Sequence, residues 1–247
     1  MVGMDQDADA GHRGRHAAEV ILFAAVLRLL AILLLALPAL AATPYHLQLE
    51  ASPAAVFPYL GKFGTVDLHV YAGGVRAETF WLNGFSRNGA AGVTVMNPLA
   101  RMYVDVPVGD IAPTLMKIAG AAGALERSLA PSLERPVAGT VGTFAATRYR
   151  LTYGPSGWID VWTTDAIPEN AQLRKLVDEF VRGISPGTAN VSRSIRGTPV
   201  YVELNFRRFK KVPLLRVKKV AFAAEDEKDA LTLGKFYIRH ALLEMLF

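Results

Sequence analysis

The sequence predicts an α+β fold in which helices cover one face of an antiparallel sheet. Three observations support this. Segments that alternate apolar and polar residues, as half-buried strands do, recur through the chain after residue 42. Glycine-containing dipeptides of the kind found in tight hairpins separate several of these segments. Helical periodicity interrupts the strands at two places only, whereas a parallel α/β sheet would alternate strands and helices.

The first 41 residues have the layout of a secretory signal peptide. Arg13 and Arg15 precede an apolar run that ends Ala39-Leu40-Ala41, with small residues at the −3 and −1 positions of a cleavage site. We expect cleavage after Ala41, export to the periplasm or the exterior, and a single domain over residues 42–247. The chain contains no cysteine. An exported domain without disulfides depends on its core for stability.

An uncleaved membrane anchor is the alternative interpretation of this segment. The apolar run from Val20 to Ala42 is long enough to span a bilayer, which takes about 20 residues. Arg28 lies within it, and a charge at the centre of a span costs about 2.5–3.5 kcal/mol on insertion scales. If Arg28 instead closes the cationic region, Leu29–Leu37 is an apolar stretch of ordinary length for a signal peptide. Cleavage is favoured, and an inner-membrane anchor stays open.

Five strands are predicted in the first part of the domain. In the clearest of them, Val66, Leu68 and Val70 alternate with polar residues. Gly73-Gly74 and Asn88-Gly89 mark turns between strands. The predicted segments are Tyr45–Glu50, Thr65–Tyr71, Val75–Leu82, Gly92–Met96 and Arg101–Val106.

The periodicity then becomes helical from Asp110 to about Leu133, where apolar residues recur three and four positions apart. A second helix is predicted to begin at Pro168, in the first-turn position that proline favours, and to end at Ile184, before Pro186. Four further strands flank this helix, and the tail Asp229–Phe247 is ambiguous between a short strand at Phe236–Ile238 and an amphipathic helix. The four strands are Thr143–Tyr153, Gly157–Thr163, Val200–Phe206 and Leu214–Phe222.

Several segments of the chain match a known family in a loose way. They are Arg101–Pro107, Gly142–Tyr149, Trp158–Thr163 followed by Ile167-Pro168, Arg196–Val200 and Gly234–Ile238. From Leu47 to Ile238 the sequence resembles the lipoprotein-carrier superfamily, with its LolA/LolB-like fold. It is more closely similar to secreted proteins of unknown function that share that architecture. The resemblance implies a strongly curved antiparallel sheet, an incomplete barrel, with helices packed on its concave face.

The resemblance also implies an acyl chain or lipid held between sheet and helices. Such a site needs inward-pointing apolar side chains beyond those that the helices cover. The helix Asp110–Ala119 would close it, through Leu115, Met116 and Ile118. The strand candidates are Val66, Leu68, Val70, Trp81, Val95, Met102, Val104, Tyr149, Leu151, Ile159, Val161, Val202 and Leu204. The same residues could equally form a closed core without a ligand, and alternation alone does not separate the two.

A run of basic residues without an intervening acid lies near a predicted hairpin tip. Its first four members are Arg207, Arg208, Lys210 and Lys211. One interpretation is a solvated turn that also discourages pairing at a sheet edge. The other is a patch that approaches anionic lipid headgroups, which fits the net charge of +5. Nucleic acid is the poorer partner, because an exported protein rarely meets it.

The sequence offers little for catalysis. The histidines after residue 42, His46, His69 and His240, lack metal-ligand spacing, and no Gly-x-Ser-x-Gly motif is present. Asp160, between Trp158 and Trp162, is predicted to be an outward-facing residue flanked by aromatic rings. We therefore expect no enzyme, no metal and no cofactor. The predicted function is non-catalytic binding of an apolar ligand by an exported protein. The alternative is a cell-envelope interaction module with a closed core.

Overall fold

The computed structural model describes residues 44–51, 65–80, 82–110, 130–184, 186–206, 209–222, 227 and 229–241. The predicted signal segment lies outside these ranges, and so do Trp81, Leu115, Met116 and Ile118. None of the helices within them has the length and apolar character needed to cross a membrane.

The described strands form one sheet with two free ends, in the order β13-β6-β5-β4-β3-β2-β1-β12-β11-β10-β9-β7, and β8 also pairs with β9. All of the described pairings are antiparallel except the short parallel pairing of β13 with β6. The predicted sheet-rich, mainly antiparallel fold is thus confirmed. The strand bounds are β1 Tyr45–Ala51, β2 Thr65–Val70, β3 Gly74–Glu78, β4 Asn83–Arg87, β5 Gly92–Asn97, β6 Met102–Pro107, β7 Ser132–Leu133, β8 Val137–Val141, β9 Phe144–Thr152, β10 Gly157–Thr164, β11 Thr198–Phe206, β12 Phe209–Ala221 and β13 Ile238–Arg239.

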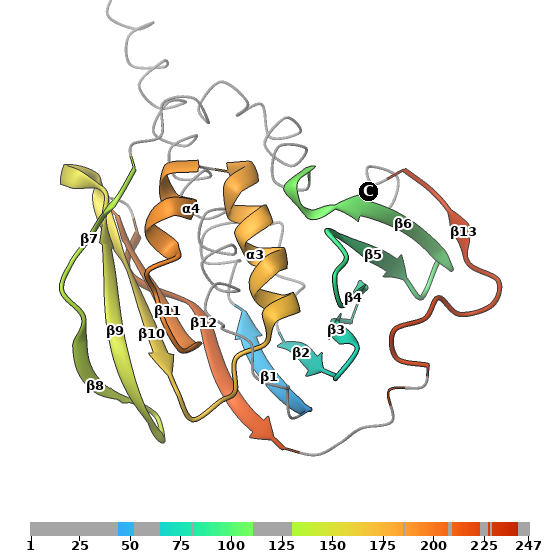
Figure 1. Cartoon of the computed structure of the whole chain (residues 1–247), viewed down its shortest axis with the longest axis horizontal. Coiled ribbons are helices and arrows are strands. Elements are labelled where there is room, and N and C mark those ends of the chain that lie inside the picture. Colours follow the sequence, from blue (N-terminus) through green and yellow to red (C-terminus); the bar gives the residue numbers. More distant parts are fainter. Residues whose placement is uncertain are drawn as a thin grey trace, which may run out of the picture.

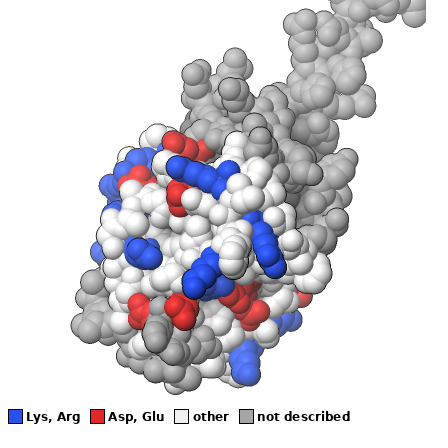
Figure 2. Space-filling model, turned by 90° about the vertical axis from the view of Figure 1, so that its right-hand side faces the viewer, with Lys and Arg blue, Asp and Glu red and all other residues white. Residues whose placement is uncertain are grey.

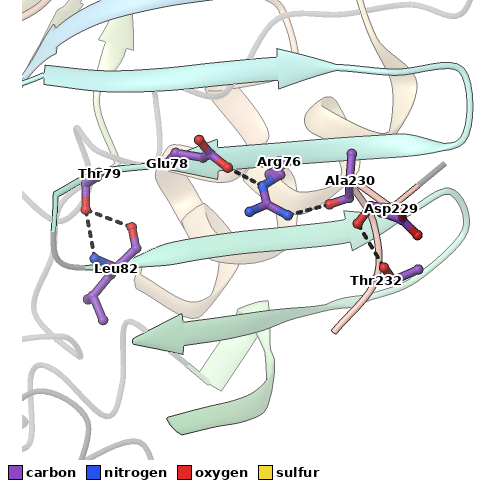
Figure 3. A network of polar contacts seen from close by, with 7 residues as sticks. All are labelled: Arg76, Glu78, Thr79, Leu82, Asp229, Ala230 and Thr232. Atoms are coloured by element: carbon purple, nitrogen blue, oxygen red, sulfur yellow. Dashed lines mark hydrogen bonds and ion pairs between the residues drawn. The ribbon is translucent and has the colours of Figure 1, made fainter. Parts of the chain in front are cut away.

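One predicted strand is shorter than expected and is followed by a turn. The prediction of a strand over Val75–Leu82 is wrong after Glu78, because the chain turns there and returns as β4. The Thr79 hydroxyl closes this turn by donating to the carbonyl of Leu82 and accepting from its amide (Figure 3). Strand β4 escaped prediction because Phe85 is its only large apolar residue.

The predicted helix Asp110–Leu133 is wrong at its end. Ser132 and Leu133 form β7, which pairs with β9. A few residues later β8 forms a hairpin with β9 through a two-residue turn, in which Gly142 has a positive φ of 58°. Such turns favour glycine, which carries no Cβ. Residues 111–129, the greater part of the predicted helix, lie outside the described ranges.

The second predicted helix begins later than Pro168. Helix α3 spans Ala171–Ile184, and the Asn170 side chain caps it by accepting a hydrogen bond from the amide of Leu173 at 2.9 Å. Pro186 was predicted to end the helical region. Instead it is the first residue of a further helix, α4 (Pro186–Ser192). Both roles suit a residue that fixes φ and donates no amide hydrogen bond, so proline alone does not distinguish them.

Helices α3 and α4 lie against one face of the sheet, between β9–β12 on one side and β3–β6 on the other (Figure 1). Leu173, Leu176 and Val177 of α3 belong to the same buried cluster as apolar residues of β1, β2 and β9–β12. We call this cluster the main core. Its strand residues alternate along the chain with polar residues on the opposite face, which we call the polar face.

Two polar groups are buried near the start of α3. The hydroxyl of Tyr45 and Oε2 of Glu169 have no hydrogen-bond partner among the described residues. The other Glu169 oxygen accepts a hydrogen bond from the amide of Gly197 at 2.6 Å. Burial raises the pKa of Glu169 above its ordinary value of 4.5 and, with the nearby charge of Glu169, also raises the pKa of Tyr45.

We therefore expect a specific pH dependence of stability. Because the folded chain holds the Glu169 proton more tightly than the unfolded chain, this group stabilises the fold below the unfolded pKa. That contribution is lost as the pH rises through the raised folded pKa. Glu169→Gln keeps the oxygen that Gly197 needs but does not titrate. Relative to the wild type, its free energy of unfolding should increase between pH 4 and pH 7. Urea denaturation at several pH values measures this, and a pH-independent difference would contradict it.

Candidate functional site

Most of the predicted ligand-lining residues are buried in the main core. Leu151, Ile159 and Val161 are fully buried, and α3 packs in the same cluster. Close packing of this kind leaves little room for a ligand among these side chains. The predicted residues in the main core are Leu68, Val70, Tyr149, Leu151, Ile159, Val161, Val202 and Leu204, with Val66 packed against them.

The other described candidates belong to a separate apolar cluster. Val104 and Val106 of β6 are buried, and Leu82, Val95 and Met102 pack against them while half-exposed. We call these five residues the edge cluster. The structure thus divides the predicted set between a closed core and a second, less covered group on β5 and β6.

The strand register places both groups on one face of the sheet. Paired residues run across six strands, so that their side chains share a face. The row, from β1 to β6, is Leu47, Leu68, Ala77, Gly84, Val95 and Val104. Its two middle members are the smallest, so the face dips between Leu68 and Val95.

The dip at Gly84 is open among the described residues. A methyl group placed on Gly84 would meet a single described atom within 4 Å, the carbonyl oxygen of Thr94 at 3.7 Å. Ala77 and Gly84 are both half-buried. We call this feature the apolar slot: its floor is Ala77 and Gly84, and its walls are Leu68 and Val95. The sequence analysis missed Ala77 and Gly84, because small residues carry no signal until the register is known.

A second hollow, of about 800 Å³, involves the polar face at β4–β6. Arg87, Asp105 and Arg239 are among its lining residues, together with Phe85, Thr94 and Tyr103. Arg239 lies 3.9 Å from Asp105, so charges of both signs meet there. Figure 2, which views the side with β6 and β13, also shows basic and acidic side chains interspersed.

The C-terminal residues 229–241, which we call the strap, help to form this hollow. Arg76 donates to the carbonyl of Ala230 at 2.8 Å (Figure 3), and Arg87 donates to that of Leu231 at 3.1 Å. Leu231 is buried in a cluster with Tyr71, Phe85 and Met96. The strap then joins the sheet as β13, so the predicted short strand at Phe236–Ile238 is displaced to Ile238–Arg239.

The predicted basic patch is only partly described. Lys210 and Lys211 are exposed on β12, next to the hairpin tip where Phe206 pairs with Phe209. Arg207 and Arg208 lie outside the described ranges. Further along β12, Lys218 forms an ion pair with Glu50 at 2.7 Å, and this contact lowers the pKa of Glu50.

Titratable groups on the polar face form pairs. His46 contacts Asp67 at 3.0 Å and stacks on His69. No group of three or more potential metal ligands occurs in the described part of the chain. Asp160 lies on the polar face as predicted, yet it is buried and accepts two hydrogen bonds from Arg150.

Comparisons with known proteins add little. No family model matches the sequence. No curated protein matches it either. Among solved structures, the chain is similar to an uncharacterized conserved protein from Thermus thermophilus, with a TM-score of 0.45 and 10% sequence identity. That match covers 81% of this chain and 91% of the other. A likeness at this level carries no argument about function.

Proposed function

We propose that this is an exported, non-catalytic protein that binds an acyl chain or a similar apolar ligand in the apolar slot. The proposal includes cleavage of the signal peptide, and a sheet curved as an incomplete barrel with the helices on its concave face. The resemblance to lipoprotein carriers motivates it. The observation that carries it is the dip at Ala77 and Gly84, on the apolar face of the sheet and between two apolar groups.

The dimensions of the slot suit a polymethylene chain. Adjacent strands lie about 4.8 Å apart. Because Ala77 and Gly84 lie on adjacent strands and have no large side chains, the space above them is a strip about two strands wide. Leu68 and Val95 bound this strip with branched apolar side chains. Each methylene group buried there would contribute about 0.8 kcal/mol. An apolar strip of this kind selects ligands by length and volume more than by headgroup.

A basic surface would serve such a protein at a membrane. Lys210 and Lys211 are exposed at one hairpin tip. Each basic residue near an anionic bilayer contributes about 1 kcal/mol of attraction. With Arg207 and Arg208 they would bring the protein to the lipid surface, which is part of the proposal.

Filling the slot tests the proposal directly. Gly84→Val adds a branched side chain above the floor, and Gly84 has no positive φ that would disfavour the change. Valine also favours strands more than glycine does, so the fold should be no less stable. We expect a fluorescent C16 fatty acid to bind the wild type and to bind Gly84→Val at least about tenfold more weakly, the loss of two buried methylenes.

The control changes the neighbouring strand on the opposite face. Thr94→Val is close in size, and Thr94 contacts Asp105 on the polar face. This variant should bind the probe as the wild type does. Unchanged binding by Gly84→Val, with thermal unfolding showing an intact fold, would overturn the slot as the site. Absence of probe binding to the wild type would favour the alternative, a cell-envelope interaction module, with which the closed main core is compatible.

A further inference from the structure

Strand β8 offers an unpaired edge of the sheet. It pairs with β9 on one side, and no described strand pairs with its other side. Residues 137–140 are all exposed, Val137 to 47%. Its sequence, Val-Ala-Gly-Thr-Val, contains neither a charge nor a proline. Natural proteins normally protect an edge with such residues, because an unprotected edge pairs with another strand.

The hairpin geometry shows which residues of β8 face outward. Val141 and Phe144 close the two-residue turn and therefore form a hydrogen-bonded pair. Pairs alternate along an antiparallel ladder, so Gly139 is also hydrogen-bonded to β9. Ala138 and Thr140 belong to the alternate pairs. Their backbone amide and carbonyl groups point away from β9, toward the open edge.

This edge is complementary to itself. When a second β8 runs antiparallel and the two Gly139 residues are opposite each other, Ala138 faces the partner's Thr140 and Thr140 faces the partner's Ala138. These are the residues with outward backbone groups, so each pair can exchange its hydrogen bonds. Val137 then faces the partner's Val141. Because β8 contains no charged residue, no like charges oppose each other in this register.

Gly139 keeps the centre of this register clear. Its missing Cβ would lie 2.8 Å from Cζ3 of Trp162, which reaches over β8 from β10. Trp162 is half-buried, with Arg148 above its ring at 5.9 Å. The two-fold axis of an antiparallel strand pair is perpendicular to the sheet. Two copies would therefore place both indoles on the same face, one beside each Gly139, where a second copy covers more of each ring.

We propose that two copies of this protein associate through β8, in antiparallel register about Gly139, to form one continuous sheet. A second copy is the occupant because its β8 reproduces the required pattern of outward groups without introducing a charge. The contact is two-fold and uses the same edge in both copies, so it closes at the dimer. It goes beyond the proposed ligand binding, because β8 is at the opposite end of the strand order from β5 and β6.

A charge exchange tests both the contact and its register. In A138K/T140K each introduced lysine faces a lysine of the other copy, whereas in A138K/T140E each lysine faces a glutamate. Both positions are exposed, so the fold should tolerate either variant. Directly opposed like charges destabilise a strand pair and opposite charges stabilise it. We expect A138K/T140K to raise the dimer dissociation constant about tenfold or more, and A138K/T140E to restore or tighten dimerisation.

Sedimentation equilibrium of the untruncated protein, at up to about 1 mM, measures these constants for a contact of modest size. Leu99→Lys with Ala100→Lys adds the same charge at exposed positions away from β8 and should dimerise as the wild type does. A wild type that stays monomeric over this range would overturn the proposal. Equal dissociation constants for A138K/T140K and A138K/T140E would also overturn it, because association would then not use this register.

Discussion

Replacing Arg150 with leucine is expected to lower the free energy of unfolding by about 3–5 kcal/mol, because it strips a buried carboxylate of its partner. The Asp160 side chain is 8% exposed and accepts hydrogen bonds from Arg150 at 2.6 and 2.7 Å. The same contact raises the pKa of Arg150. The guanidinium also lies 4.8 Å from the centre of the Trp158 ring, a contact that leucine replaces only in part. Urea denaturation at pH 7 measures the loss.

The double variant Arg150→Leu/Asp160→Leu separates the unpaired charge from the loss of packing. Exchanging both members of a buried ion pair for apolar residues is often close to neutral. We therefore expect the double variant to be more stable than Arg150→Leu alone. A single variant within about 1 kcal/mol of the wild type, or a double variant that is no better, would show that Asp160 does not depend on Arg150.

Truncating Leu204 should cost about 2–5 kcal/mol of unfolding free energy, the range for a buried leucine changed to alanine. Leu204 is fully buried on β11, where it pairs with Ile159 of β10 and Val212 of β12. Rigid strands on both sides restrict how far the site can collapse, so a cavity remains.

Leu99 provides a control with the same chemical change. It is 64% exposed in a turn, so Leu99→Ala should alter the free energy of unfolding by no more than about 0.5 kcal/mol. Denaturation curves of the two variants give the comparison. Similar losses at the two positions would contradict the assignment of Leu204 to the main core.

Residue alternation located the parts of the fold where burial is one-sided. Strands β9 and β10 lie within one residue of the predicted bounds, and Leu151, Ile159 and Val161 face the main core as the pattern requires. Alternation predicts these strands correctly because each has one face covered by helices and one polar face. Apolar and polar side chains therefore alternate every second residue along the strand.

The elements that were missed are those with weak side-chain signals. Each of strands β4 and β8 contains a glycine, Gly84 and Gly139, which interrupts the alternation of apolar and polar side chains. The helix was predicted to begin at Pro168, but it begins after Asn170, whose side chain caps it. Both residues are common at helix starts, so the local sequence did not show which of them marks this one. These outcomes are decided by partner strands and by caps, which the local sequence specifies only weakly.

The candidate site depended even more on three-dimensional context. Hydrophobicity and alternation selected the residues of the main core and the edge cluster together. The apolar slot between them exists because the register aligns Ala77 with Gly84, and register comes from the pairing of several strands. The burial of Asp160 likewise follows from Arg150 on the adjacent strand, ten residues earlier in the chain. The predicted plug residues Leu115, Met116 and Ile118 remain a prediction.

The central claim is that an apolar ligand occupies this protein, and the most direct measurement is the analysis of what it carries. The protein would be purified without detergent from its native host, extracted with organic solvent and analysed by mass spectrometry, with Gly84→Val treated in parallel. We expect acyl chains at close to one per wild-type molecule and a strong depletion in the variant. An extract of the wild type without acyl chains, or equal amounts from both proteins, would contradict the claim.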